Sequence, residues 1–295
     1  MTLVAEAPHV GAAPGGSSGE PGASELSAEG AAVDADIRVL DPRPRVSVVV
    51  PTFNEAKNLP HVFALMPDDL HEVIVVDGHS TDRTIEVARE LRPDVVIVRQ
   101  TRRGKGNALA CGFEAVTGDV VVMLDADGSA DPREIPTFVA ALVAGADFAK
   151  GSRFAEGGGS SDITRIRRLG NSLLFALVNV LFGTRYSDLC YGYNAFWTHC
   201  LTVLDLESGE DADAMHWGDG FEIETVINTR IARAGLDIRE VASFEHERVH
   251  GVSNLNAVTD GLRVLKAICI ERLARTRPTP TVPAEVLALR RQKAA

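Results

Sequence analysis

Two carboxylates stand one residue apart directly after an apolar run. Residues 120–124 have the composition of a buried strand, and Asp125 and Asp127 follow it. Such a pair can hold a hard divalent cation, because Mg²⁺ accepts one or two carboxylates and fills its other positions with phosphate oxygens and water. A calcium-binding EF-hand would need a Glu at the twelfth position from Asp125, where Pro136 stands. The pair therefore indicates a metal that bridges to phosphate.

Polar side chains also follow the first two apolar runs. Residues 52–55 (Thr-Phe-Asn-Glu) come after the run 46–50, and residues 77–82 (Asp-Gly-His-Ser-Thr-Asp) come after the run 72–76. A turn with a helix cap accounts for the end of the second cluster. It does not account for Asp77, whose carboxylate can accept hydrogen bonds from a nucleobase N–H or a ribose hydroxyl.

A short basic stretch supplies the charge that phosphate needs. Residues 102–106 read Arg-Arg-Gly-Lys-Gly and come just before an expected helix. Free backbone N–H groups and cationic side chains at a helix start favour bound phosphate. The spacing is neither that of a Walker A loop nor that of a dinucleotide-binding GxGxxG turn.

The elements that must position these clusters alternate between strands and helices. Strands are expected at 46–50, 72–77, 94–99, 119–124 and 147–150, and helices at 56–66, 82–91, after 104–106 and at 132–144. Asp131 is the expected cap of the last helix. This order predicts an α/β fold, a mostly parallel sheet with helices on both faces. Ligands bind such sheets beyond the carboxyl ends of their strands, so the polar clusters are expected to share one crevice.

The regular alternation of strands and helices ends after residue 151. A mobile loop is expected at 156–161, and the basic residues 165–168 lead to an apolar helix at 171–182. Later elements are expected as a helix at 221–234, a strand at 237–244, a helix at 257–274 and a short basic helix within a loose extension at 276–295. Phe196 and Trp197 are expected in the core.

Composition narrows the functional class. Lys and Arg number 30 and Asp and Glu 41, a net charge of −11, which argues against a nucleic-acid-binding surface. Residues 1–36 hold six of the acids and no Lys or Arg, so residues 1–44 are expected to be a disordered acidic tail. The four cysteines form no CxxC pair, which favours reduced thiols and a cytoplasmic location. The longest apolar run, 173–182, is half of the roughly 20 residues that a membrane span needs.

Together these motifs resemble family 2 glycosyltransferases with the GT-A fold. The resemblance rests on residues 48–55, 75–84, 103–106 and 124–127 in their order and spacing. It covers about residues 45–272 and implies a catalytic domain at 45–275. The second-half motifs resemble the polyprenyl-phosphate hexosyltransferase branch, which includes dolichyl-phosphate mannose synthases and glucosyltransferases. These motifs are residues 150–154, 187–194, 220–224 and 248–254.

The resemblance implies a role for each matching residue. The nucleoside would be held by Pro51, Thr52, Asn54, Glu55 and Asp77. Arg103 and Lys105 would lie near the phosphates, Asp125 would face the ribose or the metal, and Asp127 would bind Mg²⁺ or Mn²⁺. Arg153 and Arg248 would face the donor or acceptor phosphate. The reaction would move a hexose from a nucleotide-diphosphate sugar, a UDP- or GDP-hexose, with inversion in one displacement.

The acceptor decides whether a base is needed. A polyprenyl phosphate is already anionic near pH 7, whereas a hydroxyl acceptor requires a carboxylate to take its proton. Glu222 matches the position of an acidic residue in the family, with Asp219 as second choice. The structural alternative is that Glu222 and Glu224 are simply acids at a helix start.

Several alternatives stay open at this point. Ser129 stands where mannose synthases usually carry a Gln ligand, which favours UDP-glucose over GDP-mannose. The acceptor could be a soluble hydroxyl compound, and Asp125-Ala-Asp-Gly-Ser also resembles the motif of haloacid-dehalogenase phosphatases. A catalytically inactive binding module is disfavoured, since the expected carboxylates and cations are present. Residues 165–182 and 262–275 are candidates for peripheral contact with the inner face of a membrane.

Overall fold

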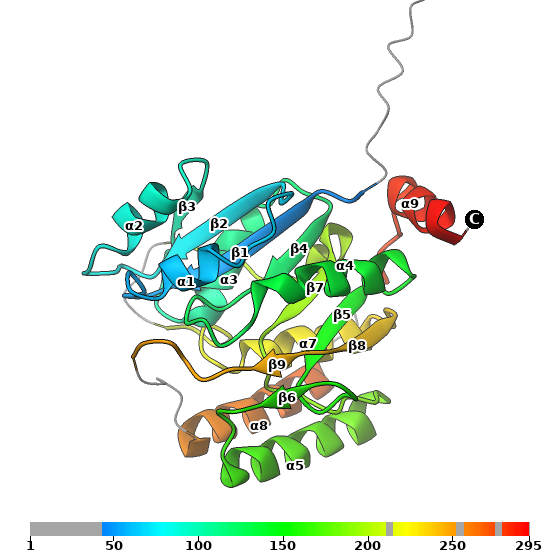
Figure 1. Cartoon of the computed structure of the whole chain (residues 1–295). Helices are drawn as coiled ribbons and strands as arrows, with labels where there is room; N and C mark the ends of the chain where they lie inside the picture. The colour runs from blue at the N-terminus through cyan, green and yellow to red at the C-terminus, as the bar shows by residue number, and fades with distance from the viewer. Residues whose placement is uncertain (1–42, 211–214, 252–256, 275–278, 295) are drawn as a thin grey trace, which may run out of the picture. The chain divides into compact units, whose positions relative to one another are not determined.

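The central element is a sheet with the strand order β3-β2-β1-β4-β7-β5-β8 (Figure 1). Its strands are β1 Val46–Thr52, β2 Glu72–Asp77, β3 Val96–Arg99, β4 Val120–Met123, β5 Phe148–Ser152, β7 Asn194–Trp197 and β8 Ile238–Ala242. β1 to β4 run parallel, β7 is antiparallel to both neighbours, and β5 and β8 are parallel. The predicted mostly parallel sheet is confirmed.

Helices cover both faces of this sheet. They are α1 Leu59–Phe63, α2 Thr84–Leu91, α3 Lys105–Glu114, α4 Ile135–Val143, α5 Arg165–Phe182, α6 Leu201–Leu204, α7 Ile223–Arg233, α8 Ala257–Leu273 and α9 Ala284–Ala294, with single 3₁₀ turns at Pro132–Glu134 and Thr198–Cys200. In Figure 1, α4 lies in front of the sheet and α7 behind it. Asp131 caps the turn before α4 as predicted, since its side chain accepts a hydrogen bond from the Arg133 N–H.

This computed structural model describes residues 43–210, 215–251, 257–274 and 279–294, which belong to a unit spanning Asp41–Ala295. Apart from its last two residues, the acidic tail predicted at 1–44 lies outside the described residues.

The core explains why the first strands are apolar throughout. Val48, Val75 and Val121 are fully buried, as are their neighbours along each strand, because helices cover both faces of a parallel sheet. β2 and β4 pair with opposite edges of β1, so the chain reverses its direction across the sheet at β1. The register places Thr52 beside Asp77, and the Leu124 N–H donates to the Val49 carbonyl oxygen. The polar clusters therefore start at one edge of the sheet, at the topological switch point.

Two strands, β7 and the short β6 Gly159–Ser160, were not predicted. β7 inserts antiparallel between β4 and β5, and its Phe196 and Trp197 are fully buried, which confirms them as core residues. The loop expected at 156–161 contains β6, which pairs with β9 Phe244–Glu245.

Of the predicted helices, α1 and α5 differ most from their expected bounds. The helix expected at 56–66 is only Leu59–Phe63, with Pro60 in its first turn. α5 begins at Arg165 rather than near residue 171, because Thr164 caps it by accepting from the Arg167 N–H. The basic residues 165–168 are thus the first turn of α5.

The C-terminal extension is packed in its described part, contrary to the expectation that it is loose. Val286 of α9 is buried in the main core, and Leu289 packs against it. The Arg290 guanidinium donates to the Ala146 carbonyl oxygen and pairs with Asp147 at 2.9 Å. The packing of Val286 and Leu289 and the ion pair of Arg290 therefore hold α9 against the rest of this unit.

α5 and α8 pack against each other at the lower end of the molecule in Figure 1. A second apolar cluster fills their interface, formed by Val178, Tyr186, Leu189, Val264 and Ile268. Within the described ranges, no helix combines the length and apolar character needed to cross a bilayer.

Candidate active site

A cavity of about 1550 Å³ opens at the carboxyl edge of the sheet and extends to α5 and α8. Most of the predicted site residues line it: Pro51, Thr52, Glu55, Arg103, Lys105, Asp125, Asp127, Arg153 and Arg248. Asn54, Asp77, Asp219 and Glu222 are outside the lining. The predicted convergence of the three polar clusters on one crevice is confirmed.

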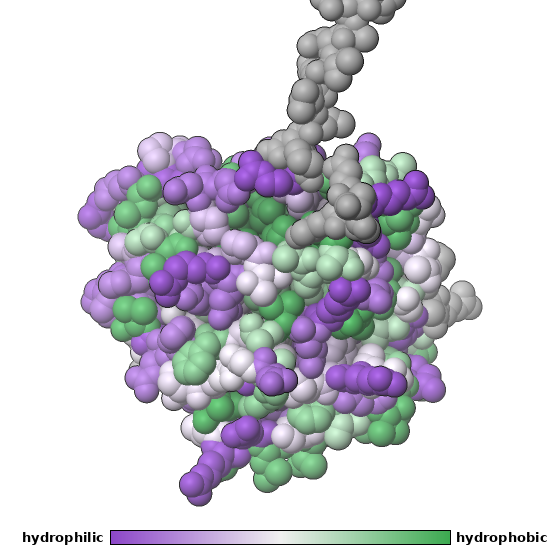
Figure 2. All heavy atoms as spheres, turned by 45° about the vertical axis from the view of Figure 1, so that its right-hand side comes forward, coloured by the Kyte–Doolittle hydropathy of each residue, from purple (hydrophilic) through white to green (hydrophobic). Residues whose placement is uncertain are grey.

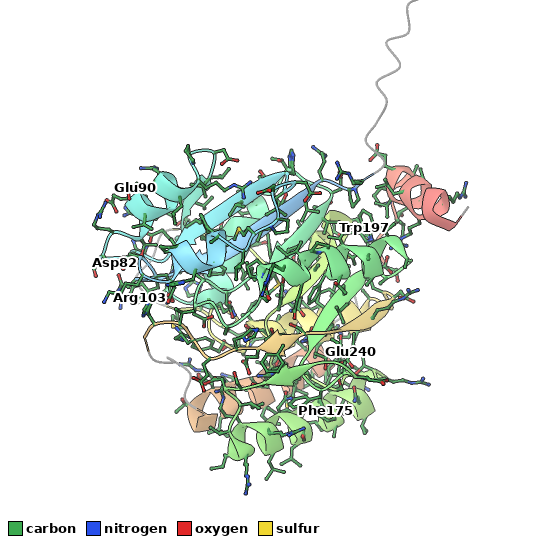
Figure 3. All side chains as sticks on the ribbon, in the orientation of Figure 1. Asp82, Glu90, Arg103, Phe175, Trp197 and Glu240 are labelled. Carbon is green, nitrogen blue, oxygen red and sulfur yellow. The ribbon has the colours of Figure 1, made fainter. Side chains whose placement is uncertain are left out.

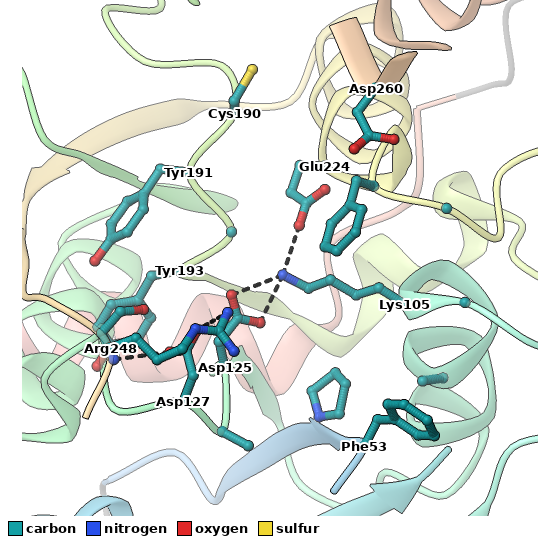
Figure 4. Close-up of a pocket in the computed structure, with 18 of the residues that line it drawn as sticks. Phe53, Lys105, Asp125, Asp127, Cys190, Tyr191, Tyr193, Glu224, Arg248 and Asp260 are labelled. Carbon is teal, nitrogen blue, oxygen red and sulfur yellow. Dashed lines mark hydrogen bonds and ion pairs between the residues drawn. The ribbon is translucent and has the colours of Figure 1, made fainter. Parts of the chain in front are cut away.

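A lysine lies between two carboxylates at the centre of the cavity (Figure 4). The Lys105 Nζ atom, at the start of α3, is 2.7 Å from Asp125 Oδ1 and 2.7 Å from Glu224 Oε1. Gly192 makes room for this group, because a Cβ atom there would lie 2.9 Å from Nζ and 3.0 Å from Glu224 Oε1. Burial alone would lower the pKa of Lys105, but the two carboxylates raise it, so the ammonium stays charged.

Glu224 is a site residue that the sequence reasoning treated as an ordinary helix-start acid. Its side chain is 6% exposed, and burial raises its pKa although Lys105 opposes the shift. Successive helix residues are about 100° apart, so two acids two positions apart cannot face the same cavity. Glu222 points elsewhere, and its carboxylate accepts from the Gly218 N–H at 3.1 Å.

An arginine from the segment after β9 covers the second carboxylate of the pair (Figure 4). Arg248 Nη2 is 2.7 Å from Asp127 Oδ2, and its Nη1 is 3.7 Å from Glu55 Oε1. The Ser129 N–H donates to Asp127 Oδ1 at 2.9 Å. Burial raises the pKa of Glu55, and the charge of Asp127 adds to this shift, while Asn58 and Arg248 oppose it.

The donor set fits a metal that is shared with a ligand. Asp125 and Asp127 leave the same strand end and both face the cavity. Among the residues that the structure describes, no three His, Cys, Asp or Glu side chains are grouped closely enough to hold an ion by themselves. Two carboxylates with phosphate oxygens and water completing the shell is the coordination that Mg²⁺ prefers.

Both glycines of the basic stretch are required by close backbone packing. Gly104 has φ +110°, and a Cβ atom on Gly106 would lie 1.8 Å from the Gly218 carbonyl oxygen. The Gly106 N–H donates to the Asp219 carbonyl oxygen at 2.8 Å. The start of α3 therefore packs closely against the turn before α7, and this contact fixes the position of the Lys105 backbone.

Asp219 is held in this turn and does not face the cavity. Its carboxylate receives two hydrogen bonds from the Arg102 guanidinium, at 2.8 and 2.9 Å, and one from the His216 N–H. Arg102 is buried, whereas Arg103 is exposed on the cavity wall. Figure 3 shows Arg103 on the same side of the molecule as Asp82.

Asp77 and Asn54 shape the loops that follow β2 and β1. Asp77 is fully buried and accepts from the Ser80 N–H at 3.2 Å. Asn54 has φ +58°, and its Oδ1 accepts from the Thr81 N–H at 2.8 Å. Gly78 and Thr81, in the loop that these two side chains hold, line the cavity.

Arg153 is buried in an ion-pair network in the wall of the cavity. Its guanidinium pairs with Asp188 at 2.7 Å and Glu245 at 3.0 Å, and it stacks 5.0 Å from the centre of the Tyr191 ring. Burial would lower its pKa, but the two carboxylates raise it. Arg153 is therefore a fixed positive charge in the cavity wall.

The sequence model of Glycosyl transferase family 2 matches residues 47–201, more than half of the chain. The chain belongs to this family. The matched region contains the carboxylate pair, the basic stretch and the polar loops after β1 and β2. Membership rules out the phosphatase alternative for the Asp-x-Asp motif.

Relatives of this family 2 glycosyltransferase include enzymes named for lipid phosphates. It is 32% identical to a polyprenol monophosphomannose synthase of Mycolicibacterium smegmatis, over 75% of this chain and 84% of that protein. It is 33% identical to an undecaprenyl-phosphate mannosyltransferase of Micrococcus luteus, over 72% of this chain and 88% of that protein. The predicted resemblance to the polyprenyl-phosphate hexosyltransferase branch is confirmed.

A solved structure supports the fold. Glucosyl-3-phosphoglycerate synthase from Mycobacterium tuberculosis, in complex with Mn²⁺, UDP and phosphoglyceric acid, is 24% identical with a TM-score of 0.60. The match covers 79% of this chain and 80% of that one. This glycosyltransferase therefore has the predicted GT-A fold.

Proposed function

We propose that this glycosyltransferase moves a hexose from a nucleotide-diphosphate sugar to a polyprenyl phosphate, in one metal-dependent displacement with inversion. Residues 45–275 would form the catalytic domain. One observation carries the proposal: a single cavity joins the carboxylate and cation cluster around Asp125 and Asp127 to the apolar helices α5 and α8. Charged donor chemistry and a lipid chain would meet in that cavity.

The donor end supplies what departure of a nucleoside diphosphate needs. Asp127, with Asp125, would hold Mg²⁺ or Mn²⁺ against the pyrophosphate, and the bound metal would neutralise the charge that develops on the leaving group. Lys105 and Arg103 both line the cavity and would add positive charge there. The loops held by Asn54 and Asp77 would enclose the nucleoside.

The acceptor end favours an anionic nucleophile. Each of Asp125, Asp127 and Glu224 has a cationic nitrogen 2.7 Å from a carboxylate oxygen, so these oxygens already accept hydrogen bonds and are not placed to take a proton from an acceptor hydroxyl. A phosphate acceptor needs no base near pH 7, whereas a hydroxyl acceptor does. Arg153 would face the acceptor phosphate as a fixed cation.

The lower surface fits a lipid substrate that stays in its membrane. α5 and α8 expose large apolar side chains, namely Ile166, Leu169, Leu173, Val180, Leu262, Leu265 and Leu273. Arg165, Arg167 and Arg168 open α5 beside them. Figure 2 shows hydrophobic and hydrophilic residues side by side at this lower end. We propose peripheral membrane contact here, with the cavity opening toward the lipid.

Two donors are tested against each other. Asp-Ala-Asp-Gly with Ser129 favours UDP-glucose, whereas the named relatives are mannosyltransferases, which favours GDP-mannose. Thermal unfolding is measured with UDP, GDP, UDP-glucose and GDP-mannose, each with and without Mn²⁺. A ligand at a hundredfold excess over its Kd stabilises the fold by about 2.7 kcal/mol. A metal-dependent rise with one nucleotide family identifies the donor, and no rise with any of the four contradicts the proposal.

A further inference from the structure

Both oxygens of the proposed metal ligand are already occupied by groups of the chain. Asp127 Oδ2 is 2.7 Å from Arg248 Nη2, and Oδ1 accepts from the Ser129 N–H. The Asp127 and Arg248 side chains are 11% and 26% exposed, so this pair is screened from water on most sides. A metal ion that binds Asp127 through Oδ2 would therefore compete with the guanidinium for this oxygen.

The backbone that carries Arg248 is fixed over the carboxylate pair. The Val249 N–H donates to the Asp127 carbonyl oxygen at 3.1 Å, and the His246 N–H donates to the Ser129 carbonyl oxygen at 2.8 Å. On the other side, Asn58 Nδ2 donates to the His250 carbonyl oxygen at 3.2 Å. The guanidinium can therefore leave Asp127 by side-chain rotation while its backbone stays beside the site.

We propose that Arg248 is a stand-in cation, which neutralises Asp127 in the free protein and transfers to the diphosphate when the metal arrives. This rests on the proposed function, since it takes Asp127 as the metal ligand. Metal alone would leave a displaced guanidinium beside a dication, which is unfavourable. A diphosphate gives the guanidinium new acceptor oxygens. Metal and nucleotide then bind as a unit, each improving the affinity for the other by the same factor.

Lys105 does not take part in this exchange to the same degree. It pairs with Asp125, but Glu224 holds it from the opposite side at 2.7 Å. Among the residues that the structure describes, the second carboxylate near Arg248 is that of Glu55, at the longer distance of 3.7 Å. The structure thus distinguishes a fixed cation from an exchangeable one.

The test measures Mn²⁺ binding in the absence of nucleotide, with electron paramagnetic resonance reporting the concentration of free Mn²⁺. Arg248→Gln should bind Mn²⁺ about tenfold more tightly than the wild type, since a charge-assisted hydrogen bond no longer competes. Arg248→Lys should fall between the two. The matched control is Arg83→Gln, which removes an exposed arginine paired with Glu90 away from the cavity. It should bind Mn²⁺ like the wild type.

Two further measurements separate the possible failures. Arg248→Gln should lose most of the increase in Mn²⁺ affinity that UDP or GDP gives the wild type, and Asp127→Asn added to it should abolish the gained Mn²⁺ binding. If Arg248→Gln, shown to be folded by circular dichroism, binds Mn²⁺ no more tightly than the wild type, the stand-in role is wrong. If the exchange holds but no sugar is transferred, the proposed function fails and this inference stands.

Discussion

Removal of the central lysine tests the electrostatics of the site. In Lys105→Met, a side chain of similar length leaves Glu224 buried without its counter-ion. Breaking a buried pair from one side costs about 3–5 kcal/mol, because the remaining charge is uncompensated. Asp125 adds little, since its side chain is 37% exposed and water can solvate it, whereas that of Glu224 is 6% exposed. We expect a loss of about 3 kcal/mol in the free energy of unfolding.

The partner substitution has a smaller effect. Glu224→Gln leaves Lys105 paired with Asp125, so the expected cost is about 1 kcal/mol, one hydrogen bond. The double variant Lys105→Met/Glu224→Gln holds no buried charge at this point. We expect it to be only about 1–2 kcal/mol less stable than the wild type, instead of the roughly 4 kcal/mol that additivity gives.

The assay is urea unfolding of the four proteins at pH 7 and at lower pH. Burial already raises the pKa of Glu224, and loss of Lys105 raises it further. The folded state of Lys105→Met then binds a proton more tightly than the unfolded state, so its stability rises as pH falls from the raised pKa of Glu224 toward the ordinary pKa of a glutamate in the unfolded chain. Two results would refute the reasoning. One is that the losses in unfolding free energy of the two single variants add up in the double variant. The other is that the stability of Lys105→Met depends on pH in the same way as that of Lys105→Met/Glu224→Gln.

Two other substitutions test how the frame holds the site. Gly106→Ala should lower nucleotide affinity about a hundredfold. Its Cβ atom would lie 1.8 Å from the Gly218 carbonyl oxygen and must displace the start of α3 by about 1 Å. Isothermal titration calorimetry measures the affinity, and an unchanged affinity contradicts the prediction. The control Gly170→Ala meets no atom within 4 Å in α5 and should raise stability by about 0.5–1 kcal/mol. Burial alone would raise the pKa of Asp147, but neighbouring donors and Arg290 lower it to about 2. Arg290→Met should thus lower the free energy of unfolding by about 1–3 kcal/mol at pH 7. The difference in this free energy between variant and wild type should shrink as pH falls from 4 toward 2. A pH-independent difference would show that the ion pair contributes nothing.

The position of the site followed from the sequence because strand ends are predictable. Apolar runs closed by Thr52, Asp77 and Asp125 identify parallel strands, and parallel strands end at one edge. The antiparallel β7 was missed because four residues, Asn194–Trp197, carry too short a pattern, and their partners in β4 and β5 lie far away in the chain.

The identity of the inner carboxylate did not follow from the sequence. Whether Glu222 or Glu224 faces the cavity depends on the rotation of α7, which the packing of the preceding turn against Gly106 fixes. The pairing of Asp219 with Arg102 likewise depends on a tertiary contact. Motif spacing gives the residue types of a site, whereas only tertiary packing gives their directions.

The most direct test of the central claim is transfer of labelled sugar to undecaprenyl phosphate. GDP-mannose and UDP-glucose are each offered with Mn²⁺, and the lipid-linked product is measured. We expect transfer from one donor, its loss on chelation of the metal, and a fall of about a hundredfold or more in Asp127→Asn. The control Asp94→Asn removes a carboxylate that is 68% exposed and should keep the wild-type rate. Transfer that is unaffected by chelation, or no transfer from either donor, would contradict the account.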